Sequence, residues 1–233
     1  RDLHYPLRRQ RQMCIRDSLK DSYKSLYEAI YHAGVHNKAN VKIKWIDSET
    51  INKKNVGELL SKAAGILIPG GFGNRGISGK IEAIRYAREN QIPFLGICLG
   101  MQLSIIEFTK NVLKMKNSGS SEFGKHTNNV ISLMTEWSKK NQKVKRTKEN
   151  DLGATMRLGS YPCYIKEKSL ASKVYKKKLI HERHRHRYEV NPKYRSSIEK
   201  KGLVFSGFSK DKKLLEIIEN KNHKWFLGCL LYT

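Results

Sequence analysis

Cys98 lies at the centre of a short glycine-flanked segment, GICLG, at residues 96–100. An apolar run at residues 92–95 precedes the segment, and a helix-like pattern at residues 101–108 follows it. This strand–turn–helix context is that of a nucleophile elbow, in which a sharp turn exposes the side chain at its apex. The N-terminus of the following helix is expected to lower the pKa of the thiol and favour the thiolate. We therefore predict that Cys98 is a nucleophile; a buried structural cysteine at a strand end is the alternative.

A second glycine-rich segment, GFGNRG at residues 71–76, also follows a strand pattern and precedes a helical one. It matches the G-x-G-x-x-G fingerprint of dinucleotide-binding folds, but the next strand ends at Cys98 instead of in an acidic residue for a ribose. Loops at the carboxyl ends of neighbouring parallel strands converge on one crevice. We therefore expect this loop to supply backbone N–H groups as an oxyanion hole beside Cys98. A plain tight turn is the alternative.

Histidine and arginine alternate in HERHRHRY, residues 181–188. On a strand, His184 and His186 would share one face with Glu182, and the arginines would line the other face. A dication would add to an already cationic patch, so the sequence favours no metal site here. The arginine row favours recognition of an anion or a carboxylate, and a solvated charged edge strand is the alternative.

The first half of the chain must position these segments through alternating strands and helices. Strand patterns lie at residues 41–46, 65–68 and 92–97, and helical patterns at 18–31, 56–62, 77–90 and 100–112. This series predicts an α/β fold with a doubly wound, mostly parallel sheet flanked by helices.

The second half predicts a different arrangement. Residues 117–121 are expected to form a loop, and short alternating strands are expected at residues 130–134, 155–165, 182–190, 203–208, 214–218 and 225–230. These strands predict an antiparallel or mixed second half. Residues 1–17 carry five arginines and no sustained apolar period, so we expect an extraneous or disordered lead.

Composition limits the class of protein. The chain has 233 residues, 39% of them hydrophobic, and no apolar run approaches a membrane span of about 20 residues. The N-terminal segment is basic and lacks the apolar region of a secretory signal. The four cysteines, Cys14, Cys98, Cys163 and Cys229, are scattered without a C-x-x-C pair, which disfavours a disulfide framework or a zinc ribbon. We expect a cytoplasmic protein.

The formal net charge of +25 raises the question of a nucleic-acid partner. The lysines are spread along the whole chain, without the aromatic interleaving of a single-strand binder or the stripe of a groove reader. We therefore expect solvated lysines, with no nucleic-acid or membrane partner.

Six segments together resemble the C-terminal glutamine amidotransferase domain of the CTP synthase family. They are DSYKS (21–25), PGGFGNRG (69–76), LGICLGMQ (95–102), TEW (135–137), GATMRLG (153–159) and ERHRHRYEV (182–190). The elbow is common to triad-type amidotransferases, whereas MRLG and HRHR point to this family. The resemblance implies a triad glutamine amidotransferase-like fold over residues 18–229, as a C-terminally truncated domain, with residues 230–233 as a non-family tail.

The resemblance implies a role for each matching residue. Cys98 would attack the side-chain amide of glutamine, giving a glutamyl thioester and ammonia, and the backbone amides of Gly71 and Leu99 would form the oxyanion hole. An arginine fits the α-carboxylate of glutamine and a glutamate its α-ammonium. The implied glutamine-binding residues are Gly71, Leu99, Gly100, Met101, Gln102, Glu122 and Arg187. Arg75 is an implied contact for an effector nucleotide.

The resemblance also implies partners and cofactors. In the family, ammonia passes to a synthetase domain, where ATP with Mg activates UTP for amination to CTP, and GTP is an allosteric activator of the glutaminase step. The glutaminase domain itself would hold no cofactor or metal. The synthetase domain of the same enzyme, which is absent here, would be its partner, and the full protein would be a homo-oligomer.

Two departures from the family pattern affect the expected activity. No synthetase domain precedes Ser18, so this chain would not itself make CTP. Tyr232 stands where the family has its general-base histidine, and the orienting glutamate would fall beyond Thr233. Without that base, we expect the chain as written to bind glutamine weakly and hydrolyse it negligibly.

Two other hypotheses remain open from the sequence. One is a non-catalytic, basic nucleic-acid- or nucleotide-binding module on an amidotransferase-like fold. The other is a triad amidotransferase that makes GMP or carbamoyl phosphate, which the MRLG and HRHR segments disfavour.

Overall fold

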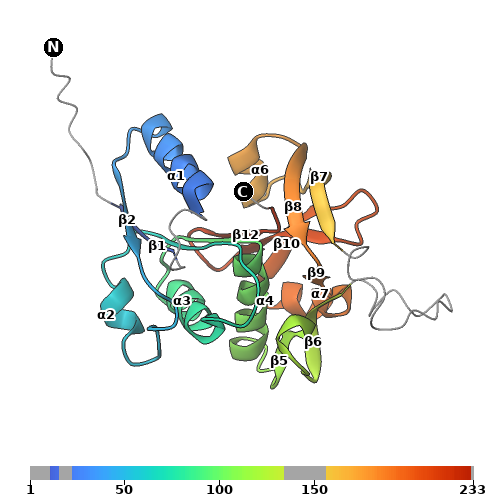
Figure 1. Ribbon diagram of the computed structural model, residues 1–233. Helices are drawn as coiled ribbons and strands as arrows, with labels where there is room; N and C mark the ends of the chain where they lie inside the picture. The colour runs from blue at the N-terminus through green and yellow to red at the C-terminus, as the bar shows by residue number, and fades with distance from the viewer. Residues whose placement is uncertain (1–10, 16–22, 134–155, 232–233) are drawn as a thin grey trace, which may run out of the picture.

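One mixed sheet of seven strands carries both halves of the fold, in the order β3-β4-β12-β11-β10-β7-β8 (Figure 1). The computed structural model describes residues 11–15, 23–133 and 156–231. The strands are β1 (Arg11–Ile15), β2 (Val41–Trp45), β3 (Ile66–Ile68), β4 (Phe94–Ile97), β5 (Ser118–Ser120), β6 (Asn128–Leu133), β7 (Arg157–Ile165), β8 (Leu179–His186), β9 (Tyr188–Val190), β10 (Leu203–Phe208), β11 (Leu215–Asn220) and β12 (Phe226–Cys229). The helices are α1 (Lys24–His36), α2 (Val56–Leu60), α3 (Ile77–Glu89), α4 (Leu99–Asn111), α6 (Leu170–Tyr175) and α7 (Arg195–Lys200).

The parallel half of the sheet positions the two glycine-rich segments. Strands β3 and β12 both pair in parallel with β4, so Ile68 lies opposite Gly96 and Cys229 lies opposite Ile97. The carboxyl ends of β3 and β4 therefore lie side by side, and the segments that follow them begin at the same edge of the sheet. The expectation of converging loops is confirmed at this point.

The other half of the sheet is antiparallel, as the second half of the sequence predicts. Each of the pairs β12–β11, β11–β10, β10–β7 and β7–β8 is antiparallel. Two smaller sheets accompany it: β1 pairs in parallel with β2, and β6 lies between β5 and β9. The α/β class and the change from parallel to antiparallel pairing both follow the expected pattern.

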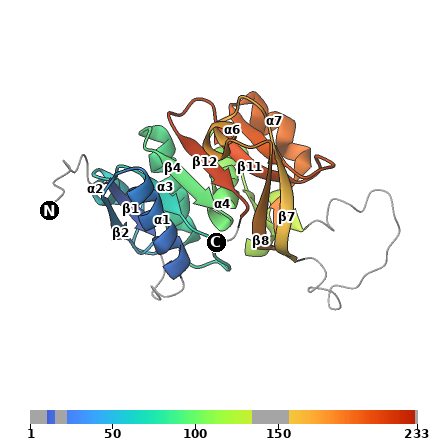
Figure 2. The same cartoon turned by 90° about the horizontal axis from the view of Figure 1, so that it is seen from above.

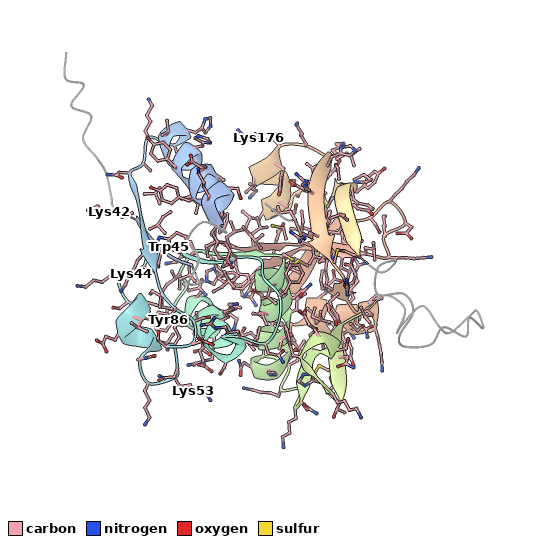
Figure 3. All side chains as sticks on the ribbon, viewed as in Figure 1. Lys42, Lys44, Trp45, Lys53, Tyr86 and Lys176 are labelled. Carbon is pink, nitrogen blue, oxygen red and sulfur yellow. The ribbon has the colours of Figure 1, made fainter. Side chains whose placement is uncertain are left out.

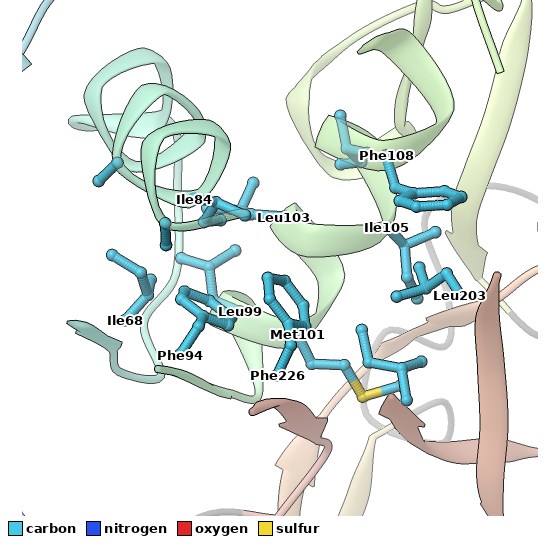
Figure 4. Close-up of a cluster of buried hydrophobic side chains, with 14 of the residues drawn as sticks. Ile68, Ile84, Phe94, Leu99, Met101, Leu103, Ile105, Phe108, Leu203 and Phe226 are labelled. Atoms are coloured by element: carbon cyan, nitrogen blue, oxygen red, sulfur yellow. The ribbon is translucent and has the colours of Figure 1, made fainter. Parts of the chain in front are cut away.

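Helices cover both faces of the large sheet and bury two separate apolar cores. Helices α3, α4 and α7 lie on one side, and α1 and α6 lie on the other (Figures 1 and 2). On the α3–α4 side, the rings of Phe94 and Phe226 stack with centroids 4.4 Å apart, in the same apolar cluster as Leu99 and Met101 (Figure 4). Helix α4 is buried along most of its length, because both the sheet and the neighbouring elements pack against it.

Two expectations about local structure are wrong, and strand pairing is the reason in both cases. Residues 118–120 form β5 instead of a loop, because they pair with β6. The expected strand at 182–190 is two strands in two different sheets. Helices α6 and α7 lie where no helix was expected.

The expected lead is also not wholly unstructured. Its residues 11–15 form β1, which pairs with β2 in parallel over five residues. The beginning of the first expected helix, at residues 18–22, lies outside the described residues, and α1 runs from Lys24 to His36. No helix in the described part of the chain has both the length and the apolar character needed to cross a membrane.

The stacked phenylalanine pair provides a test of this core. Phe226 is 2% exposed, so Phe226→Ala should lower the free energy of unfolding by about 3–5 kcal/mol through lost burial and a residual cavity. Tyr31→Ala removes an aromatic ring that is 59% exposed on α1, and we expect a change of at most about 0.5 kcal/mol. Urea unfolding measures both, and equal midpoints for the two variants would contradict the described core.

Candidate active site

Cys98 occupies a strained turn between β4 and α4. Its backbone has φ 50° and ψ −102°, and residues other than glycine rarely adopt such a positive φ. Its N–H donates to the carbonyl oxygen of Cys229 at 2.7 Å, which ties the apex of the turn to β12. The sequence therefore predicted the elbow and its neighbouring elements correctly.

The flanking glycines are required by close backbone approaches. A Cβ atom at Gly96 would lie 2.7 Å from the carbonyl carbon of Gly100, and one at Gly100 would overlap the carbonyl oxygen of Ile68 on β3. No side chain fits at either position without moving backbone. The first turn of α4 can thus pack directly against the end of β3, which brings Cys98 next to the 70–73 loop.

The 70–73 loop lies over the elbow. A Cβ at Gly70 would contact the Cβ of Cys98 at 3.4 Å, and one at Gly71 would contact the Leu99 side chain at 3.5 Å. Tyr23, just before α1, donates its hydroxyl to the carbonyl oxygen of Gly70 at 3.3 Å. The loop backbone and the Cys98 side chain therefore face the same space, as an oxyanion hole requires.

The Cys98 thiol is neutral at physiological pH. The residue is 3% exposed, and burial raises the pKa of its thiol to about 12, against a smaller lowering by the hydrogen bond from the Leu99 N–H. The carboxylates of Glu122 and Glu189 add to the upward shift of this pKa. The expectation that the N-terminus of α4 lowers the pKa of the Cys98 thiol is wrong. Desolvation of the thiolate raises this pKa by more than the helix lowers it.

A pocket of about 350 Å³ opens beside Cys98. Its lining residues are Gly71, Phe72, Cys98, Gln102, Glu122, Met156, Arg185, His186, Arg187 and Tyr188. Five of the expected site residues therefore meet here: Gly71, Cys98, Gln102, Glu122 and Arg187. They come from the 70–73 loop, α4, the turn after β5, and the junction of β8 with β9.

Three expected residues do not line this pocket with their side chains. Leu99 and Met101 point into the apolar core (Figure 4), and Gly100 lies against β3. Only their backbone is near the elbow; the Leu99 N–H bonds to the Cys98 sulfur. Five further residues line the pocket without having been predicted as site residues: Phe72, Met156, Arg185, His186 and Tyr188. The position of Phe72 inside the glycine loop could have indicated it, whereas no local pattern identifies Met156 and Tyr188, which reach the pocket through the fold.

Opposite charges line the pocket. Glu122 accepts a hydrogen bond from the Gly73 N–H at 3.1 Å, and burial raises the pKa of its carboxyl. Arg187 is half-buried, and its Nε has no hydrogen-bond partner among the described residues. Gln102 donates its Nε2 to the Tyr188 carbonyl oxygen at 3.0 Å. A pocket with a carboxylate and a guanidinium suits a zwitterionic amino acid.

His184 and His186 of the 181–188 segment are buried and uncharged. The Nδ1 of His184 lies 2.8 Å from the Nε2 of His186, and burial lowers the pKa of the two rings to about 4 and about 3. Among the described residues, no group of three or more His, Cys, Asp or Glu side chains is arranged to hold a metal ion.

The expected arginine row is wrong in one respect. Arg183 and Arg185 are exposed on β8, and Arg185 also lines the pocket. Arg187 lies past the end of β8 and is half-buried in the pocket, because the alternation stops where the chain enters another sheet.

Arg75 forms an exposed ion pair with Glu49, with Nε and Oε1 3.0 Å apart, and does not line the pocket. Tyr232 lies outside the described residues.

A larger groove of about 880 Å³ runs between α1 and the sheet, but none of its lining residues is charged, so it does not offer the same chemistry.

This site and fold define a class of protein. The family model described as glutamine amidotransferase class-I matches residues 18–229, and the chain belongs to that family. Curated relatives are CTP synthases: that of Pelagibacter ubique is 57% identical over 195 residues, and that of Rhodospirillum rubrum is 49% identical over 195 residues. Each match covers 84% of this chain but only 36% of the relative, so the chain spans about a third of their length.

Solved structures agree with this assignment. The glutaminase domain of Trypanosoma brucei CTPS, solved with bound acivicin, is 32% identical with a TM-score of 0.85, over 96% of this chain and 86% of that one. A glutamine amidotransferase from Thermotoga maritima has a TM-score of 0.57 at 12% identity, over 95% of this chain and 75% of that one, and shows the shared fold alone. The chain thus has a triad-type amidotransferase fold, which is similar to that of the glutaminase domain of CTP synthase.

The raised pKa of Cys98 predicts an unusual pH dependence of its alkylation. Because the thiol stays protonated in the folded protein, its rate of reaction with iodoacetamide should rise about tenfold per pH unit between about pH 7 and pH 10 without levelling off. In the urea-unfolded chain the rate at the same cysteine should level off above about pH 9. Mass spectrometry of the Cys98 peptide measures both, and a plateau below about pH 8 in the folded protein would contradict the assignment.

Proposed function

We propose that this domain hydrolyses the side-chain amide of glutamine. The Cys98 thiol loses its proton as the sulfur bonds to the amide carbon, and the backbone N–H groups of Gly71 and Leu99 stabilise the oxyanion that forms from the carbonyl. The carbonyl then re-forms as the C–N bond breaks, and the proton given up by the thiol passes to the leaving nitrogen, which departs as ammonia. Water cleaves the thioester, which releases glutamate and restores the thiol.

One observation carries this proposal: a single pocket holds a nucleophile, a carboxylate and a guanidinium. Cys98, Glu122 and Arg187 all line it. Glu122 would bind the α-ammonium of glutamine and Arg187 its α-carboxylate, with Gln102 beside them. The similarity to a glutaminase domain that binds acivicin supports the same assignment.

The wider role is inferred from the relatives. In CTP synthases, we infer, the ammonia from such a domain serves the ATP- and Mg-dependent amination of UTP to CTP in a synthetase domain, within a homo-oligomer. GTP would be the allosteric activator, and Arg75, on the exposed side of the glycine loop, is a candidate contact for it. Glutamine is the only substrate proposed for the domain itself, without a cofactor of its own.

The surface charge offers little support for nucleic-acid binding. The labelled lysines in Figure 3 project from separate parts of the molecule, with Lys42, Lys44 and Lys53 on the β2–α2 side and Lys176 after α6. No aromatic side chains alternate with Lys42 and Lys44 on the exposed side of β2, because Trp45 lies on the other face.

Glutamine should protect Cys98 from alkylation, and Arg187 should determine how tightly it does so. Arg187→Lys removes a planar fork that fits a carboxylate, so the half-protecting glutamine concentration should rise about thirtyfold. Arg183→Lys is the matched control, since Arg183 is exposed on β8 and does not line the pocket. The measurement is the rate of iodoacetamide labelling at Cys98 against glutamine concentration. Absence of saturable protection in the unchanged protein would refute the proposed function.

Position 232 should limit turnover. With tyrosine where the family has its general base, we expect glutaminase turnover several orders of magnitude below that of an ordinary amidotransferase. Tyr232→His supplies the missing residue type, and we expect turnover to increase about a hundredfold. Ammonia release under saturating glutamine measures this, and Cys98→Ser must abolish the activity of both proteins. Ordinary turnover by the unchanged chain would contradict the prediction.

A further inference from the structure

Arg187 is the single residue between two strands that belong to different sheets. Strand β8 ends at His186 and pairs with β7 in the seven-stranded sheet, whereas β9 begins at Tyr188 and pairs with β6 in the three-stranded sheet. The position of the Arg187 guanidinium in the pocket therefore depends on how these two sheets are held together.

Arg157 connects the two sheets directly beneath this junction. It lies on β7, opposite His186, and its two terminal nitrogens bind two carboxylates. One nitrogen is 2.7 Å from Oε1 of Glu216 on β11, in the seven-stranded sheet. The other is 3.3 Å from Oε1 of Glu189 on β9, in the three-stranded sheet. The guanidinium thus bridges the sheets next to Arg187.

The bridge extends to the pocket through short contacts. The same Glu189 oxygen lies 3.5 Å from Nδ1 of His186, which is itself 3.2 Å from the Tyr188 carbonyl oxygen. Gln102 donates to that carbonyl from α4. Both neighbours of Arg187 in the chain are therefore held, one by contact with Glu189 and the other by Gln102 and His186.

This cluster is too deeply buried to be explained as a source of stability. Arg157, Glu189 and Glu216 are 7%, 1% and 2% exposed. Burial of charges carries a desolvation cost that their attraction often fails to offset, and apolar replacements are frequently as stable. An arginine fork between two carboxylates does, however, impose one geometry on the elements that it joins.

We propose that Arg157 is a positioning residue for glutamine: by holding Glu189 and Glu216 together, it fixes the β8–β9 junction so that Arg187 points at the α-carboxylate. The proposal rests on the proposed function. It assigns Arg157 no contact with glutamine or with the reacting atoms, since Arg157 does not line the pocket.

The Arg88–Glu107 pair is a matched control elsewhere in the molecule. Arg88 on α3 binds both carboxylate oxygens of Glu107 on α4, at 2.8 and 2.9 Å, and Glu107 is fully buried. Like Arg157, Arg88 loses a planar fork when it is replaced by lysine, and neither Arg88 nor Glu107 lines the pocket. Arg88→Lys therefore reports the effect of the same chemical change at a pair that makes no contact with Glu189 or Glu216.

The test compares glutamine protection of Cys98 in the full chain and in the variants Arg157→Lys and Arg88→Lys. We expect Arg157→Lys to raise the half-protecting glutamine concentration about tenfold or more, because small displacements of a binding group weaken its contacts. Arg88→Lys should leave it within about twofold of the unchanged protein. The rate of iodoacetamide labelling without glutamine should be equal in all three, since that reagent makes no use of Arg187.

A second variant guards against misfolding of the first. Glu189→Gln leaves the Arg157–Glu216 pair intact and keeps a carbonyl oxygen for Arg157, so it should fold and weaken glutamine binding in the same direction, by a smaller factor. Equal protection in the unchanged protein and both cluster variants would overturn the positioning role while leaving the proposed function intact. Loss of saturable protection in the unchanged protein would overturn both. An increased labelling rate without glutamine in Arg157→Lys would assign the effect to Cys98 and also overturn the proposal.

Discussion

The direct packing of the first turn of α4 against the end of β3 is the constraint on which the site depends. It requires glycine at position 100, where any Cβ would overlap the Ile68 carbonyl oxygen, and it places Cys98 at φ 50°. The surrounding core holds this strained turn in place, through the bond from the Cys98 N–H to Cys229 and through the buried length of α4. Without that packing, the 70–73 loop and the thiol would not share a pocket.

The electrostatics of the pocket follow from its depth. Burial keeps the Cys98 thiol protonated, raises the pKa of Glu189 to about 7 and keeps His186 neutral. A neutral thiol is a weak nucleophile, so catalysis requires a base to accept its proton during attack. The reactivity of Cys98 therefore depends on a group that can accept the thiol proton.

The match to relatives includes the residues that build this geometry. The family match spans residues 18–229, and the glutaminase domain of Trypanosoma brucei CTPS superimposes with a TM-score of 0.85. The fold alone is shared with the Thermotoga maritima amidotransferase at 12% identity. Outside the pocket, Arg157 forms a buried link between the two sheets through Glu189 and Glu216.

The sequence by itself determined the α/β class, the elbow at Cys98, the glycine loop and strands such as β10, because these depend on local pattern and backbone sterics. It also identified Glu122 and Arg187 as pocket residues through a family resemblance. Only the tertiary structure decided that residues 182–190 divide between two sheets, that Met156 reaches the pocket, and that the thiol has a raised pKa. Strand partners and desolvation arise from segments far apart in the chain, and no local pattern records which segments will meet.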